Sequence, residues 1–231
     1  MGATGLRKKV LIFVDALLDS TTAAVESYFE SHSSVNGDHH IIPMHCTSYC
    51  KDMDAVLKII DAATELAMSQ EDLIIVVGGG TLMDVVGFAA AIYKGGKSYI
   101  RVPTTLVGMI DAGVGAKVGV DFKNHKSLIG RYFAPKSCLN DSNPFLTTLP
   151  RREFACGLAE AIKVAPIESP RPFEVIERYH RNIEYNTHTE ELIRTSIRMI
   201  LQELEPNLRE ESLCRLVDFG HESGHIVEAL A

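Results

Sequence analysis

The sequence predicts an α/β nucleotide-binding domain followed by an all-helical domain. Strand-like and helix-like stretches alternate over the first 143 residues, which is the pattern of a doubly wound, mostly parallel sheet. The glycine triplet Gly78–Gly80 follows directly on the apolar run Leu73–Val77 and opens a helix-like stretch. After Asn143 few β-branched runs remain. We therefore expect the α/β domain in residues 1–143 and the helical domain in residues 144–231.

Hydrophobic spacing predicts each element of the first domain. Continuous apolar runs are typical of buried parallel strands, and apolar residues three and four apart are typical of helices. The runs predict strands at Lys9–Asp15, His40–Met44, Leu73–Val77 and Ser98–Val102. The spacing predicts helices at Thr21–Ser31 with Ser20 as N-cap, at Asp52–Met68 and at Thr81–Tyr93. The glycine-rich stretch from Asp111 to Arg131 is expected to form loops.

The second domain is expected to begin near Asp141–Pro150, where the texture of the sequence changes. Helical spacing continues from there at Glu153–Val164, Phe173–Tyr179, Glu190–Leu204 and Arg209–Leu230. The helical pattern runs to Ala231 without a glycine or proline stop signal. We therefore expect the helical domain to be truncated in this chain.

Composition excludes several classes of protein. The 231 residues are 46% apolar and 23% charged, which is typical of a folded enzyme and not of a disordered or collagen-like chain. The 23 lysines and arginines against 30 aspartates and glutamates give a net charge of −7, so a nucleic-acid partner is not expected. No apolar run approaches the length of a membrane span, so no membrane partner is expected. The five scattered cysteines favour reduced thiols and a cytoplasmic location.

The residues after two predicted strands have the chemistry of a dinucleotide site. Gly79 and Gly80 let the backbone approach a pyrophosphate, and the start of the helix offers N–H groups to it. Asp84 lies one turn later and can bind a ribose, while Thr104 and Thr105 offer hydroxyls after the next strand. The spacing is not GxGxxG. A tight turn, a solvated carboxylate and a hydroxyl N-cap remain the alternatives.

Further along, charged side chains occur in patterns that suit an oxyanion ligand. Asp111 and Lys117 bracket a glycine-rich segment, and Lys126 follows nearby. Cations in such segments can bind a phosphate or a carboxylate. Glu160 and Lys163 are three residues apart and share a face of a helix. Exposed lysines and a surface ion pair are the alternatives.

Near the end of the chain, His221 and His225 have the i, i+4 spacing of a helical zinc pair. With Glu222 they match the pattern H-E-x-x-H of a zinc hydrolase. That hypothesis leaves the glycine turn of the first domain unexplained. Two capped core histidines are the other alternative.

Five strings together identify a family. They are GGGTLMDVVGFAAAIY, RVPTTLVGMIDAGVGAKVGV, HKSLIG, LPRREFACGLAEAIK and VDFGHESGH. They occur in order from Gly78 to His225, and the chain resembles the sugar phosphate cyclase superfamily, which includes 3-dehydroquinate synthase. This resemblance covers most of the chain.

The resemblance implies a cofactor, a metal and a role for each motif residue. It implies that NAD is held by Gly79, Gly80, Asp84, Thr104, Thr105 and Asp111. It implies that a divalent metal, Zn²⁺ or Co²⁺, is bound by Glu160 and His221, with a third ligand beyond Ala231. It implies that the sugar phosphate is bound and processed by Asp111, Lys117, Lys126, Lys163 and His225. It also implies a homodimer.

Within the superfamily, the chain resembles the 2-epi-5-epi-valiolone synthase branch. Cys214 and Asp218 stand where 3-dehydroquinate synthases carry Arg and Asn. Relative to those enzymes, the chain lacks the arginine cation and gains the aspartate anion. Both changes disfavour a substrate that carries a carboxylate. The histidine at position 225, in contrast, is a feature in which the chain resembles 3-dehydroquinate synthases. That activity therefore remains an alternative.

The resemblance implies a lyase reaction without net redox change. A heptulose 7-phosphate, sedoheptulose 7-phosphate in this branch, would be transiently oxidised, lose phosphate, be reduced again and close by an aldol step to a C7 cyclitol such as 2-epi-5-epi-valiolone. A catalytically impaired NAD-binding homologue or fragment is a further alternative, because the expected metal site is incomplete.

Overall fold

The computed structural model describes residues 8–32, 38–45, 50–123, 125–164, 174, 176–177, 184–209 and 211. Backbone contacts divide the chain into two compact units. The first unit comprises Met1–Pro103 and Ala116–Asn140, and the second comprises Thr104–Gly115 and Asp141–Ala231.

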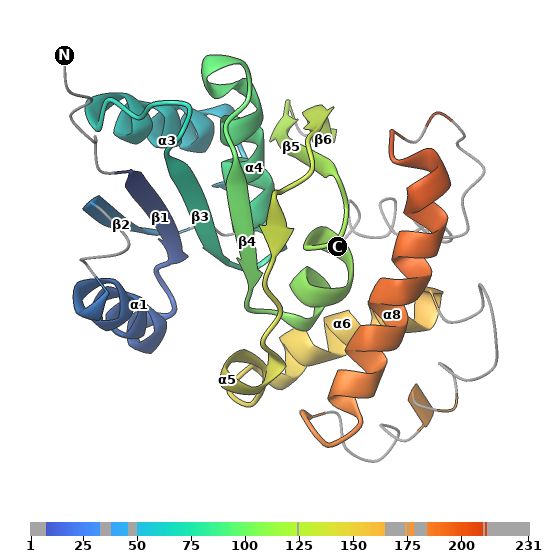
Figure 1. Ribbon diagram of the computed structural model, residues 1–231. Helices are drawn as coiled ribbons and strands as arrows, with labels where there is room; N and C mark the ends of the chain where they lie inside the picture. The colour runs from blue at the N-terminus through green and yellow to red at the C-terminus, as the bar shows by residue number, and fades with distance from the viewer. Residues whose placement is uncertain are drawn as a thin grey trace. The chain divides into compact units, whose positions relative to one another are not determined.

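The first unit is built on a five-stranded parallel sheet (Figure 1). Its strands are β1 (Lys9–Asp15), β2 (Asp38–Met44), β3 (Leu73–Gly78), β4 (Tyr99–Pro103) and β7 (Ser137–Cys138), in the order β2-β1-β3-β4-β7. The predicted parallel α/β sheet is confirmed, and its first four strands lie within two residues of the predicted bounds. β7 was not predicted because two residues are too few to show a pattern.

In the described residues, the strands are connected by the helices α1 (Asp19–Ser31), α3 (Met53–Glu65) and α4 (Gly80–Ile92), the last followed by η2 (Tyr93–Gly95). The chain passes from β1 to β2 on one side and then to β3 on the other side of β1. Because such crossovers are right-handed, α1 covers one face of the sheet, and α3 and α4 cover the other (Figure 1). The carboxyl ends of β1 and β3 are therefore a topological switch point, where α/β proteins bind ligands.

Local sequence explains where two of these helices begin. The Asp52 side chain caps α3 by accepting a hydrogen bond from the Ala55 amide at 2.9 Å. The prediction of Ser20 as the N-cap of the first helix was wrong. Leu18 is the N-cap, and its carbonyl accepts a hydrogen bond from the Thr22 amide at 2.9 Å, so Ser20 lies inside the first turn.

The prediction of loops from Asp111 to Arg131 was wrong for most of that stretch. β5 (Lys117–Phe122) and β6 (His125–Tyr132) pair as a separate antiparallel sheet. Gly119 and Gly130 face each other there, and a Cβ on Gly119 would lie 2.7 Å from the Ile129 carbonyl oxygen. The glycines that suggested loops thus permit close strand pairing.

The second unit is helical in the part that the structure describes. It contains η3 (Gly108–Ala112), α5 (Ser142–Leu146), α6 (Arg151–Val164), α8 (Thr189–Leu204) and η5 (Glu205–Asn207). α6 and α8 confirm two predicted helices. Phe173–Tyr179 and Arg209–Leu230 fall almost wholly outside the described residues. Its main core consists of Leu106, Met109, Ile110, Leu146, Phe154, Leu158, Ala161, Leu192 and Ile193.

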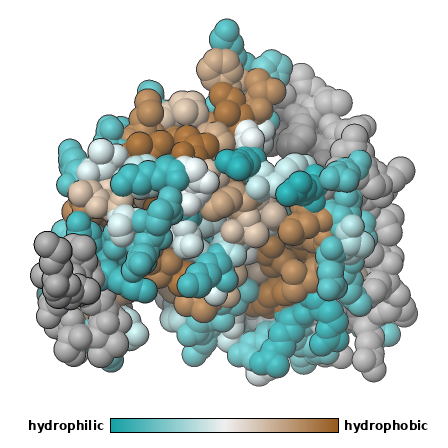
Figure 2. All heavy atoms as spheres, turned by 45° about the horizontal axis from the view of Figure 1, so that its top comes forward, coloured by the Kyte–Doolittle hydropathy of each residue, from teal (hydrophilic) through white to brown (hydrophobic). Residues whose placement is uncertain are grey.

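The surface in Figure 2 carries apolar patches separated by hydrophilic side chains. Large apolar side chains that are mostly exposed include Leu17, Leu128 and Leu139, which is normal for folded proteins when such residues are scattered. Among the described helices, none is both long and apolar enough to cross a membrane.

Candidate functional site

The turn between β3 and α4 lies at the switch point of the sheet. β3 ends at Gly78, and a Cβ there would lie 2.8 Å from the Leu82 side chain and 3.4 Å from Cβ of Asp15, the last residue of β1. Gly79 is the N-cap of α4 and supplies no side-chain cap. The first amides of α4 therefore lack a side-chain acceptor at the N-cap, and the helix dipole favours an anion at this end.

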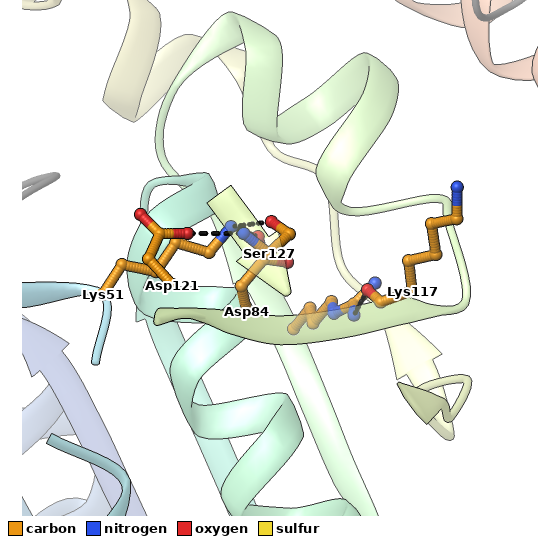
Figure 3. A network of polar contacts seen from close by, with 6 residues as sticks. Lys51, Asp84, Lys117, Asp121 and Ser127 are labelled. Carbon is orange, nitrogen blue, oxygen red and sulfur yellow. Dashed lines mark hydrogen bonds and ion pairs between the residues drawn. The ribbon is translucent and has the colours of Figure 1, made fainter. Parts of the chain in front are cut away.

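Asp84, one turn into α4, lies in a network of polar contacts (Figure 3). Its carboxylate pairs with the Lys51 ammonium at 2.7 Å, and both side chains are half-buried. The same ammonium donates to the hydroxyl of Ser127 on β6 at 3.1 Å. Asp84 is therefore an anchored carboxylate and not a solvated one.

Lys51 is a residue that sequence reasoning missed. It precedes Asp52, the N-cap of α3, in the connection that follows β2. Connections after parallel strands emerge at the carboxyl edge of the sheet, where ligands bind. That position is the one signal in the sequence that could have singled it out.

Thr104 and Thr105 follow β4 directly and belong to the second unit. Thr104 is buried. The Thr105 hydroxyl accepts a hydrogen bond from the Gly108 amide at 3.1 Å, and its carbonyl accepts one from the Met109 amide at 2.9 Å. The capping alternative is therefore correct for Thr105, and its carbonyl also helps to start η3.

Asp111 and the two predicted substrate lysines lie on different elements. Asp111 lies in η3, where its carbonyl accepts hydrogen bonds from the Val114 and Gly115 amides at 2.9 and 3.0 Å. Lys117 and Lys126 lie on the hairpin, not in loops. Figure 3 shows the Lys117 ammonium pointing away from the Lys51–Asp84 pair. The structure thus does not bring Lys117 to Asp84.

A buried arginine supports the start of the hairpin. Arg101 on β4 is fully buried, and its Nη2 lies 3.5 Å from the Lys117 carbonyl oxygen. Its guanidinium lies 5.4 Å from the centre of the Tyr99 ring. Burial raises the pKa of Tyr99 to about 12, although the Arg101 cation acts in the opposite direction. The sequence does contain a signal for this buried cation, because Arg101 lies inside an apolar strand, but sequence reasoning did not use it.

Glu160 and Lys163 form an ion pair on α6 with an N···O distance of 2.5 Å, and both side chains are half-buried. The ion pair that was an alternative interpretation is therefore present. His221 and His225, as well as Cys214 and Asp218, lie outside the described residues. Among the residues that are described, no three histidine, cysteine or acidic side chains are placed to hold a metal.

Family comparison agrees with these features. The model of the 3-dehydroquinate synthase N-terminal domain matches residues 41–156, and the model of its C-terminal domain matches residues 157–231. The chain belongs to the 3-dehydroquinate synthase family of sugar phosphate cyclases. The family predicted from the five strings is confirmed.

Individual relatives place the chain within this family. A 2-epi-5-epi-valiolone synthase of Actinoplanes sp. is 41% identical over the whole chain, which covers 59% of that relative. A 3-dehydroquinate synthase of Sulfurisphaera tokodaii is 35% identical over 96% of the chain, covering 61% of that relative. The chain thus spans about three fifths of the length of these relatives, and the similarity to the valiolone synthase branch is confirmed.

One solved structure combines fold and sequence similarity. It is a 2-epi-5-epi-valiolone synthase from Streptomyces hygroscopicus subsp. jinggangensis with NAD⁺ and Zn²⁺ bound. The TM-score is 0.86 at 35% identity, and the match covers 95% of this chain and 61% of that one. The glycine turn at the switch point fits a dinucleotide in this chain, because a bare N-cap and helix amides suit a pyrophosphate.

Proposed function

We propose that this chain serves an NAD- and metal-dependent lyase that cyclises a heptulose 7-phosphate, sedoheptulose 7-phosphate, to a C7 cyclitol such as 2-epi-5-epi-valiolone. The observation that carries the proposal is 41% identity, over the whole chain, to a 2-epi-5-epi-valiolone synthase. NAD would supply a transient hydride acceptor, and the metal would polarise a substrate oxygen. Residues 1–143 would form the NAD domain and residues 144–231 the metal domain.

The chain's own groups for NAD begin at the glycine turn. The amides after Gly79 and Gly80 would bind the pyrophosphate, and the Asp84 carboxylate would accept hydrogen bonds from ribose hydroxyls. Further contacts would come from Thr104, Thr105 and Asp111. The Lys51–Asp84 pair at 2.7 Å supports this role for Asp84, because the cation fixes the direction of its carboxylate.

Glu160 and His221 would hold the divalent metal. Carboxylate and imidazole are donors that both Zn²⁺ and Co²⁺ accept. The Lys163 ammonium, 2.5 Å from Glu160, fixes the position of that carboxylate on α6. The donor chemistry therefore fits, although His221 lies outside the described residues.

The substrate phosphate needs cations near it, since the net charge of the chain is −7. Lys117, Lys126 and Lys163 would neutralise the phosphate, while Asp111 would orient substrate hydroxyls and His225 would assist proton transfer near the phosphate. Moving a proton close to the leaving phosphate lowers the cost of its departure.

The nature of the substrate's other end decides between the branches. The thiol of Cys214 and the carboxyl of Asp218 are poor partners for a substrate carboxylate. A neutral sugar end, as in sedoheptulose 7-phosphate, suits them better. The match at 35% identity to a 3-dehydroquinate synthase keeps that activity as the second candidate.

Phosphate release tests the proposal directly. The purified chain would be incubated with NAD and Zn²⁺ or Co²⁺, in parallel with sedoheptulose 7-phosphate and with 3-deoxy-arabino-heptulosonate 7-phosphate. We expect release from the first substrate only. Release from the second only would identify a 3-dehydroquinate synthase. If a folded sample binds NAD but releases phosphate from neither, the non-catalytic alternative is favoured and the cyclase proposal fails for this chain.

A further inference from the structure

Three residues from three separate segments form a closed ring of hydrogen bonds. The Lys51 ammonium donates to the Ser127 hydroxyl at 3.1 Å, and the Ser127 amide donates to Oδ1 of Asp121 at 2.6 Å. The Asp121 amide donates to the Lys51 carbonyl at 2.8 Å, which closes the ring. Lys51 precedes α3, Asp121 lies on β5 and Ser127 on β6, all within the first unit (Figure 3).

The ring holds an irregular part of the hairpin. The register of β5 against β6 shifts between Val120 and Phe122, so Asp121 lies at the irregularity. Ser127 has a φ of 48°, in the left-handed region that costs a serine about 1 kcal/mol. In this conformation its amide is directed to Asp121 and its hydroxyl to Lys51. The two hydrogen bonds offset the cost of this conformation.

The ring also fixes the direction of the Lys51 ammonium. One N–H of this group goes to Ser127, and the ion pair to Asp84 takes another at 2.7 Å. Lys51 and Asp84 side chains are 17% and 22% exposed, so water screens the pair only partly. Asp84 lies one turn after the glycine turn of α4. Its carboxylate is thus oriented by a cation that the hairpin holds in place.

We propose that Asp121 and Ser127 are positioning residues of the nucleotide site, which act through Lys51 on the Asp84 carboxylate. The inference rests on the proposed role of Asp84 in binding NAD. It assigns a function to two hairpin residues that need not touch the cofactor. It also ties the segment that carries Lys126 to the helix that begins at the glycine turn.

Substitutions at Ser127 separate positioning from stability. Ser127→Ala removes the hydroxyl and keeps the strained backbone. Ser127→Gly also removes the hydroxyl but accepts a positive φ without strain, so its unfolding midpoint should stay near that of the wild type. Ser127→Asn tolerates the left-handed region and offers an amide oxygen to Lys51. Ser137→Ala, on exposed β7, removes a serine hydroxyl outside the ring and is the matched control.

NAD titration and thermal unfolding of the full chain measure both effects. We expect the Kd for NAD to rise about fivefold in Ser127→Ala and Ser127→Gly, the loss of one net hydrogen bond. Ser127→Asn and Ser137→Ala should bind as the wild type does. A weaker Kd in Ser127→Gly without a lower midpoint would support positioning.

Other outcomes overturn the inference. Suppose that the wild type binds NAD and that Ser127→Ala and Ser127→Gly bind it equally tightly. The inference then fails, and the proposed function stands. If the Kd for NAD rises only in those variants whose unfolding midpoint falls, the ring serves stability alone and the inference also fails. A folded wild type that does not bind NAD overturns both.

Asp121 provides a second, independent pair of variants. Asp121→Ala removes the acceptor of the Ser127 amide, whereas Asp121→Asn keeps an acceptor oxygen at that place. We expect Asp121→Ala to weaken NAD binding about fivefold and Asp121→Asn to do so less. Asp38→Ala, at an exposed position of β2, is the control. Equal binding by all four proteins would contradict the inference.

Discussion

Gly157 lies in the middle of α6, where alanine is normally the better helix former by about 1 kcal/mol. A Cβ at this position would lie 2.4 Å from both Cβ and Cγ of Leu106. Cβ is fixed to the backbone, so Leu106 cannot yield by turning its side chain. Close contact between these two segments therefore decides the residue at 157.

We expect Gly157→Ala to destabilise the protein by about 1–3 kcal/mol, since overpacking outweighs the gain in helix propensity. Chemical denaturation of the variant measures this. The control is Ala159→Gly at an exposed position of α6, which should lose only the propensity of about 1 kcal/mol. A more stable Gly157→Ala would show that Leu106 can move.

Tyr99 gives a prediction about alkaline pH. Burial raises its pKa from 10.0 to about 12, against the effect of the Arg101 cation. The folded state therefore holds the phenol proton more tightly than the unfolded state does. The stability from this group is fully present below pH 10 and is lost as pH rises toward 12.

Spectroscopic titration of the phenols should show one tyrosine ionising near pH 12, and Tyr99→Phe should remove that step. The variant also loses the hydrogen bond from the Tyr99 hydroxyl to the Phe133 carbonyl at 3.0 Å, worth about 1 kcal/mol. Its loss of stability between pH 10 and 12 should be smaller than in the wild type. An unchanged titration curve would contradict the assignment.

Among the elements, α3 is followed at its carboxyl end by a cluster of lysine contacts. Three lysine ammoniums donate to carbonyls just after it: Lys9 to Leu66 at 2.6 Å, Lys94 to Met68 at 2.7 Å and Lys97 to Ser69 at 2.5 Å. Cations at a helix carboxyl end are favourable because the last carbonyls lack partners within the helix. These tertiary contacts add to a local C-cap, in which Ala67 has a φ of 46° and the Met68 amide donates to the Ala63 carbonyl at 3.1 Å.

Lys97 is the buried member of this set, and Lys94 is exposed. We expect Lys97→Met to cost about 2 kcal/mol of unfolding free energy, because the buried Asp72 carboxylate and the Ser69 carbonyl lose their cation. Lys94→Met should cost less than about 1 kcal/mol, since water replaces the ammonium. Equal effects in denaturation experiments would contradict the role of burial.

For the whole molecule, ligand binding couples to folding. The family has NAD-binding members, and the glycine turn suits a pyrophosphate. A ligand that binds only the folded state stabilises it by about 2.7 kcal/mol at one hundred times its Kd. If the proposed NAD site is present, the unfolding temperature should rise with NAD concentration.

We expect NAD to raise the unfolding midpoint of the wild type and to do so much less in Asp84→Asn, whose Kd should be about tenfold weaker. Asp54→Asn, at an exposed acidic residue of α3, is the control and should respond as the wild type does. Equal NAD-dependent shifts in the three proteins would remove Asp84 from the proposed site.

Sequence reasoning succeeded where one short segment carries the whole signal. The buried runs of β1 and β3, the helical spacing of α3 and the glycine turn are local patterns. Their physical cause, hydrophobic spacing or a nearby donor, lies within a few residues. The five motif strings likewise determined the family without any contact being known.

Contacts between distant segments were decided only by the tertiary structure. Lys51 and Asp84 are 33 residues apart, and nothing in the sequence near Lys51 shows that its ammonium meets Asp84. The hairpin was taken for loops because its glycines serve cross-strand pairing, which the partner strand reveals. Burial and pairing depend on which segments meet in space. The sequence by itself therefore determined most of the elements and the family, whereas folding alone selected which charged residues from distant segments face one another.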